Sequence, residues 1–153
     1  MRPSARLKEL GLTLPTLAAP IGAYVPALRV GDLVYTSGQL PFENGKLPQV
    51  GAVGRELTLE QGAAAARTAA LNALAAAASA AGGIDAIARI VRVCVYVASA
   101  PGFTDQPKVA NGASHLLGEL FGDAGKHVRS AVGVNELPMG APVEVELTCL
   151  VGR

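Results

Sequence analysis

The stretch VRSAVGVNELPMGAPVEVELTCLV, residues 128–151, decides the fold because it encodes two strands joined by a loop. In residues 142–151 polar and apolar side chains alternate, which is the period of a strand with one face against a hydrophobic core. Residues 128–134 are also rich in β-formers, and their valines predict the side that faces the core. The residues between the two runs are typical of a turn. This stretch therefore predicts two strands of a half-buried sheet.

The sequence before residue 128 alternates extended and helical patterns. Residues 58–61, Thr-Leu-Glu-Gln, form a capping box ahead of an alanine-rich run that ends at Gly82 and predicts a long helix. The other predictions are a β-hairpin over residues 24–38, an Asn-Gly turn at 44–45, a strand over 88–97 and a second helix over 109–121. Two helices on one face of a mixed sheet bury these apolar faces, so we expect an α+β fold.

Composition indicates one domain. Half of the 153 residues are hydrophobic, which is enough for a single core. Residues 1–20, a short charged helix followed by prolines, are expected to be an N-terminal extension, and residues 21–153 to be the domain. The chain has few aromatic and many alanine residues, which favours self-association. The 13 basic and 12 acidic residues are not clustered, so we expect no nucleic-acid partner.

The amino-acid sequence also bears on cellular location and on the state of the two cysteines. The first twelve residues carry charges and lack the apolar run of a secretion signal, so a cytoplasmic protein is expected. Residues 63–81 are too polar and too small-sided for a membrane span. Cys94 and Cys149 lie in predicted strands without metal-ligand spacing, and we interpret both as buried structural thiols.

Arg129 is the first candidate for a functional side chain. On a strand it shares one face with Ala131 and Gly133, and the valines between them predict that this face points away from the core. Small neighbours would leave space in front of a guanidinium, which suits bidentate binding of a carboxylate. A salt bridge to Glu144 or Glu146 is the simpler interpretation of the same residues.

Glu144 and Glu146 are expected on the non-core face of the last strand. A solvated face is the simple interpretation, but burial between subunits would raise the pKa of one carboxyl and let it position water or exchange a proton. His115 and His127 lack the spacing of metal ligands, so no metal site is expected. The sequence contains no motif for nucleotide binding or for a serine-hydrolase triad.

Two groups of residues resemble the RidA/YjgF family. The first comprises residues 21–25, IGAYV, and 35–41, YTSGQLP; the second comprises 129–134, RSAVGV, followed by Leu137-Pro138 and 143–146, VEVE. The resemblance covers nearly the whole chain from residue 20 to residue 151. It implies a chorismate-mutase-like α+β domain that forms a homotrimer with a cleft at each subunit interface.

The resemblance also implies an activity. Deaminases of this family hydrolyse reactive enamines or imines derived from amino acids, of the 2-iminobutanoate and 2-iminopropanoate type, and release ammonia and a 2-oxo acid without a cofactor. Arg129 matches the residue that binds the substrate carboxylate, and Glu144 the residue that positions water. The matching cleft residues are Tyr24, Ser37, Asn111 and, where the family often has cysteine, Ala131.

Three departures distinguish this chain from the archetypal deaminases. Ala131 replaces a thiol, the second predicted helix lacks the usual aromatic residue, and the N-terminal extension is longer. They leave open a second function, a non-catalytic protein that binds or senses a small carboxylate metabolite. A ribonuclease, an activity attributed to parts of the family, is disfavoured by the balanced charge. The natural substrate and the roles of the extension, His115 and His127 stay undetermined from the sequence.

Overall fold

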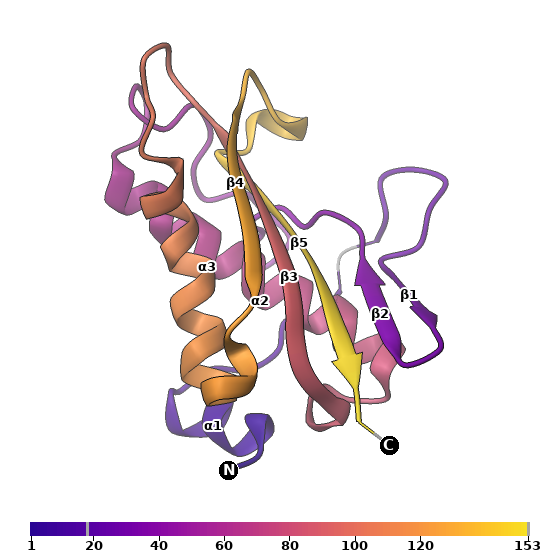
Figure 1. The fold of residues 1–153 in the computed structure, drawn as a ribbon. Helices are drawn as coiled ribbons and strands as arrows, with labels where there is room; N and C mark the ends of the chain where they lie inside the picture. Colours follow the sequence, from indigo (N-terminus) through magenta and orange to yellow (C-terminus); the bar gives the residue numbers. More distant parts are fainter. Residues whose placement is uncertain (18, 153) are drawn as a thin grey trace.

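The computed structural model describes residues 1–17 and 19–152. The described residues form three α-helices and five strands, which are labelled in Figure 1. In chain order they are α1 Pro3–Glu9, β1 Ala27–Val30, β2 Leu33–Thr36, α2 Leu59–Ala81, β3 Ile87–Ala98, α3 Gln106–Phe121, β4 Val128–Val134 and β5 Val143–Val151, with short 3-10 turns η1 Ile84–Ala86, η2 Gly122–Gly125 and η3 Pro138–Gly140. Each predicted helix and strand is present, although several begin or end a few residues from the predicted position.

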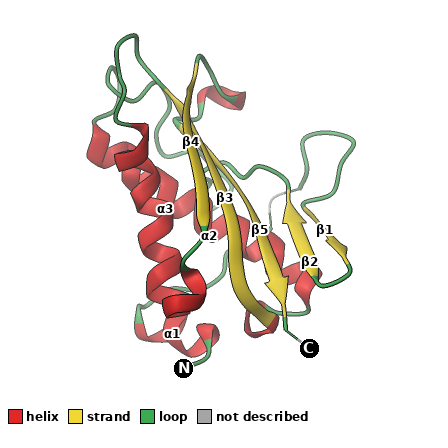
Figure 2. Ribbon diagram, in the orientation of Figure 1, coloured by secondary structure: helices red, strands yellow, loops and turns green. Residues whose placement is uncertain are grey.

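The five strands form one mixed sheet in the order β1-β2-β5-β3-β4. β3 and β4 pair in parallel, with α3 as the crossover between them, and the other pairs are antiparallel. Figure 2 shows α2 passing behind the sheet and α3 running along its β4 edge. The two long helices cover one face and enclose the core, which confirms the predicted α+β arrangement.

Small residues allow the two long helices to approach closely. α2 begins with the predicted capping box, in which Thr58 and Gln61 bond reciprocally, and it ends at Gly82 in the left-handed conformation. Nine of its twelve buried residues are alanines. On α3, a Cβ at Gly112 would collide with the carbonyl oxygen of Ala63. The alanine-rich composition therefore sets the spacing of the helical layer.

The segment between β2 and α2 forms isolated bridges and contributes no strand to the sheet. Gln39 makes an isolated bridge to Val145, and the turn at Asn44 and Gly45 has positive φ values of 51° and 77°. Asn72, a buried polar residue on α2, donates from Nδ2 to the carbonyl oxygens of Leu40 and Phe42. The segment is thus held on α2 by a side chain instead of by a sheet ladder.

β3 contains two bulges that determine which side chains face the core. Against β5, one residue is inserted at Ala88 and another at Val91. As a result Ile90 and Val93 are both fully buried although they lie three residues apart. Beyond Val91 the predicted alternation holds, with Arg92 on the face opposite Val93.

The face that carries no helix is called the open face below. One row of paired residues crosses it through all five strands: Leu28, Tyr35, Thr148, Arg92 and Val128. Cys94 also lies on this face and is partly exposed, so the expectation of a buried thiol is wrong for it. Cys149 is buried as expected, and burial raises the pKa of its thiol to about 11.

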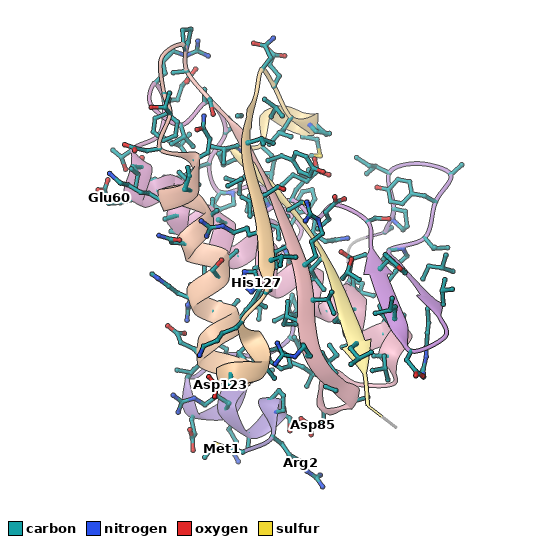
Figure 3. All side chains as sticks on the ribbon, viewed as in Figure 1. Met1, Arg2, Glu60, Asp85, Asp123 and His127 are labelled. Atoms are coloured by element: carbon teal, nitrogen blue, oxygen red, sulfur yellow. The ribbon has the colours of Figure 1, made fainter. Side chains whose placement is uncertain are left out.

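The N-terminal helix packs beside α3 and η1. Leu7 is buried, and Ser4 donates from its backbone nitrogen and its hydroxyl to the Asp85 carboxylate, at 2.9 and 2.6 Å. Figure 3 shows Asp85 next to the start of the chain. Among the described helices, none is long and apolar enough to cross a membrane.

Candidate functional site

Arg129 lies on β4 and points toward α3. It pairs with Val93, whose side chain is fully buried, so the two share the helix-covered face. Its guanidinium Nη1 donates to Asn111 Oδ1 at 2.8 Å and to Ser114 Oγ at 3.1 Å, and Nη2 donates to the Pro107 carbonyl at 3.2 Å. All three acceptors are neutral, so they fix the guanidinium without cancelling its charge.

The predicted orientation of β4 is therefore wrong. Its valines were expected to face the core, but Val128 and Val132 are 61% and 45% exposed, and they lie on the open face. Ala131, by contrast, packs against the core on the same side as Arg129. β4 is an edge strand, and the helix above it offers polar groups to Arg129, so the side of the strand with fewer apolar residues faces inward.

His127 and Ser114 extend the hydrogen-bond chain behind Arg129. His127 Nδ1 lies 2.6 Å from the Gly125 carbonyl oxygen, and its Nε2 lies 2.9 Å from Ser114 Oγ. A carbonyl oxygen only accepts, so Nδ1 carries the proton, and in the neutral ring Nε2 accepts from the Ser114 hydroxyl. Figure 3 shows His127 just before β4, facing α3. The order of donation is Arg129 to Ser114, then Ser114 to His127.

Sequence reasoning missed Ser114 as a site residue. Asn111 and Ser114 are three residues apart on α3, so they lie on one face of the helix and can both contact Arg129. The spacing of three residues from Asn111 is the sequence signal by which Ser114 could have been predicted as a site residue. His127 lies two residues before Arg129 in the sequence, and His115 is exposed elsewhere on α3.

An open cavity of about 320 Å³ lies in front of these groups and is called the Arg129 cavity below. Its lining is Ser114, Gly118, Gly125, Lys126, His127 and Arg129, with no acidic residue. Lys126 pairs with Asp123 at 2.8 Å, and both are strongly exposed. Within the described part of the chain, no carboxylate forms an ion pair with Arg129. The salt bridge considered from the sequence is absent there, and the cavity is suited to an anion.

Glu144 lies on β5 and points to the open face. It is paired with Tyr96 of β3, and its carboxylate rests on Gly38, where a Cβ would collide with Glu144 Oε1. Burial raises the pKa of Glu144, and the negative charge of nearby Glu146 raises it further. Gly38 thus provides the room in which this carboxylate sits, desolvated and more easily protonated than an ordinary glutamate.

Tyr24 shares a small cavity of about 80 Å³ with Glu144, called the Glu144 cavity below. Gly38 and Gln39 line it from the segment after β2, and Pro138 from η3. Ser37 precedes Gly38 but bonds through its hydroxyl to the Val25 carbonyl at 2.6 Å, which holds the segment that carries Tyr24.

Glu146 has a different partner from Glu144. Tyr96 donates its hydroxyl to Glu146 Oε1 at 2.8 Å, and this bond, together with burial, raises the pKa of Tyr96 to about 12. The two glutamates of β5 share a face, as predicted, but among the described groups Glu146 has a side-chain hydrogen-bond partner and Glu144 has none. No motif in the sequence indicates this hydrogen bond of Tyr96.

Two half-sites result from this arrangement. One joins Arg129 with Asn111 on the helix-covered side, and the other joins Glu144 with Tyr24 on the open side. The sheet separates the two, so a single chain does not bring Arg129 and Glu144 together. In the described residues there is no group of three or more side chains that could hold a metal ion.

Comparisons with known proteins find matches over almost the full length of this chain. A family model described as "YjgF/chorismate_mutase-like, putative endoribonuclease" matches residues 4–150. Protein TCP17 of Trypanosoma cruzi is 44% identical over 146 residues, covering 95% of this chain and 91% of that protein.

Solved structures are similar as well. A Shewanella oneidensis MR-1 crystal structure, named a "putative endoribonuclease", superposes with a TM-score of 0.95 at 37% identity and covers 99% of this chain and 100% of that one. E. coli TdcF, solved with bound serine, has a TM-score of 0.64 at 25% identity and covers 89% of this chain and 94% of that one.

Proposed function

Because the chain belongs to the YjgF/chorismate-mutase-like family, we propose that it is a small-molecule enamine/imine deaminase that binds its substrate's carboxylate through Arg129. The observation that carries the proposal is the state of this arginine, whose three acceptors are neutral while its cavity has no acidic lining. A positive charge held in place without a counter-ion favours an anionic ligand. The serine bound to TdcF carries a carboxylate of the same kind.

Glu144 is the proposed proton carrier. Water adds to the carbon of the C=N bond, and Glu144 accepts a proton from that water. Glu144 passes that proton to the imine nitrogen, which gives a neutral carbinolamine. The C–N bond then breaks while Glu144 transfers the hydroxyl proton to the amino nitrogen, so that ammonia leaves and a 2-oxo acid remains. A carboxyl with a raised pKa is suited to both transfers, because it gains and loses a proton more readily near neutral pH.

The reaction needs Arg129 and Glu144 at one substrate, so we propose that the site forms between copies of the chain in a homotrimer. The open face supports this assembly, because Leu28, Tyr35, Val128, Val132 and Leu150 are all at least 36% exposed there. Exposed apolar residues on one face are typical of an interaction surface. Arg129 of one copy and Glu144 of the next would then close one cleft from two sides.

A non-catalytic carboxylate-binding function is the second candidate. It is favoured by Ala131, which follows Arg129 on the same face and brings neither a thiol nor another reactive group to the Arg129 cavity. An RNA substrate is less suited to this protein, because the formal net charge is only +1 and the Arg129 cavity is about 320 Å³.

Ammonia release from freshly generated 2-aminoacrylate tests the proposal. The native chain is expected to accelerate release over the spontaneous rate, and Arg129→Ala to reduce kcat/KM by about 100-fold. Arg29→Ala is the matched control, since Arg29 is an exposed arginine that bonds only to the Gly31 carbonyl among described groups. Unchanged release in Arg129→Ala would overturn the role of the arginine. Carboxylate binding without release of ammonia would favour the non-catalytic carboxylate-binding function.

A further inference from the structure

A further cavity of the described chain lies under the N-terminal extension. Residues 13–17 form one wall, the segment from Gln39 to Gly45 forms another, and Asn72 and Ala75 of α2 form the floor. Its volume of about 540 Å³ lies within the range of about 300–1,000 Å³ that is usual for small-molecule sites. None of the residues discussed as catalytic lines it.

The lining defines what this cavity could hold. Leu14, Leu17 and Phe42 supply apolar surface, and Gln39, Asn44 and Asn72 supply amide groups. No lining residue is charged. Burying an ionised group here would cost free energy without a counter-charge, whereas an apolar or amide-bearing group would be accommodated.

The cavity adjoins the half-site of Glu144. Gln39 and Phe42 line both this cavity and the Glu144 cavity. The extension contributes residues 13–17 to the larger cavity and residues 19 and 20 to the smaller one. A molecule whose reacting carbon lies at Glu144 therefore has a neighbouring space of about 540 Å³ beyond Gln39.

We propose that this cavity is the side-chain subsite of the deaminase, so that the substrates are imines of amino acids with large uncharged side chains. The inference rests on the proposed function, because it assumes that Arg129 and Glu144 hold the carboxylate and the reacting carbon. The N-terminal extension then acts as a specificity element of the site, since it provides a wall for the substrate side chain.

Binding of 2-oxo acids, the products, tests the subsite without relying on turnover. Isothermal titration compares pyruvate, 4-methyl-2-oxopentanoate and 2-oxoglutarate, which differ only in the side chain. We expect 4-methyl-2-oxopentanoate to bind at least about tenfold more tightly than the other two, because it adds buried apolar groups and no charge.

Two variants test whether the preference for 4-methyl-2-oxopentanoate arises in this cavity. Ala75→Met fills part of the cavity and is expected to abolish the preference while pyruvate binding persists; Ala80→Met, on the same helix but lining neither cavity, is the control. Leu17→Ala removes a half-buried wall of the extension and is expected to weaken the preference several-fold. If Ala75→Met fails to fold, Leu17→Ala takes its place as the test variant.

The outcomes separate the two proposals. Equal affinities for the three acids, or a preference that survives in both variants, would overturn the subsite while leaving the deaminase in place. A preference that the variants remove, without ammonia release from any imine, would support the subsite and overturn the deaminase. If none of the acids binds, both proposals fail.

Discussion

Arg129 and Glu144 of one chain lie on opposite sides of the sheet: Arg129 is paired with the buried Val93, and Glu144 with Tyr96 on the open face. Two residues that act on one substrate normally lie on the same side of a sheet. Here cooperation requires a second copy, and the separation gives a direct test of shared sites.

Mixing two inactive variants is expected to restore activity. In a trimer of Arg129→Ala and Glu144→Gln chains, one of the three interfaces combines an intact arginine with an intact glutamate, so random equimolar mixing should recover about a quarter of native activity. The measurement is ammonia release after the mixed chains are unfolded and refolded together. Each variant refolded alone is the control, and no recovery in the mixture would contradict a site that combines Arg129 of one chain with Glu144 of another.

Replacing Glu144 by glutamine is expected to stabilise the protein at neutral pH while removing activity. Because burial raises the pKa of Glu144, its contribution to stability is full below the ordinary glutamate pKa and is lost as the pH rises through the folded-state pKa. Glutamine cannot ionise and avoids this loss. We expect Tm to rise by about 1–3 °C at pH 7 and the difference from native to vanish in acid. Glu136→Gln, at an exposed glutamate, is the control; a lower Tm for Glu144→Gln at pH 7 would contradict the prediction.

Gly38→Ala should displace the Glu144 carboxylate. The new Cβ collides with Glu144 Oε1, so either the side chain or the segment after β2 has to move. We expect a loss of about 1–3 kcal/mol in the free energy of unfolding and a larger fall in kcat than in substrate affinity. Gly152→Ala, whose Cβ meets only ordinary contacts, is the matched control for urea unfolding. Native kcat in Gly38→Ala would show that the position of Glu144 is unimportant.

Ser114→Ala and His127→Gln should weaken carboxylate binding without changing the chemical step. Ser114 holds Arg129 Nη1, and His127 orients the Ser114 hydroxyl. We expect KM to rise about five- to tenfold with kcat nearly unchanged, because preorganisation of the arginine is lost. His115→Gln, at the exposed histidine of α3, is the control.

An NMR measurement separates this role from a general loss of structure. Nitrogen chemical shifts should show the proton of neutral His127 on Nδ1, as its 2.6 Å contact with the Gly125 carbonyl requires. Binding of a 2-oxo acid should perturb His127 and leave His115 unaffected. A proton on Nε2 in the neutral ring would contradict the proposed order of donation.

The architecture was accessible from the sequence because its signals are local. Thr58 and Gln61 mark the start of α2, Gly82 marks its end, and the alternation in residues 143–151 marks β5. Such signals depend on neighbours within a few residues. They identify helices and strands but not which side of an edge strand the helices cover.

The orientation of Arg129 shows that limit. The sequence pattern predicts the valines of β4 as core residues, yet Val128 and Val132 belong to the open face. Alternation specifies two faces and leaves their assignment to the partners across the fold. The contacts of Gly38 with Glu144 and of Ser114 with His127 depend in the same way on elements that only the tertiary structure brings together.

The two bulges of β3 determine where the chain can change length. Deleting Val91 removes the residue that has no partner on β5, so Ile90 and Arg92 keep their faces. Deleting Val95, in the regular part of the ladder, would turn every preceding residue of β3 to the opposite face. Deletions of one residue should therefore be tolerated at Ala88 and Val91 and disruptive a few positions later, although each removes a small apolar residue from the same strand.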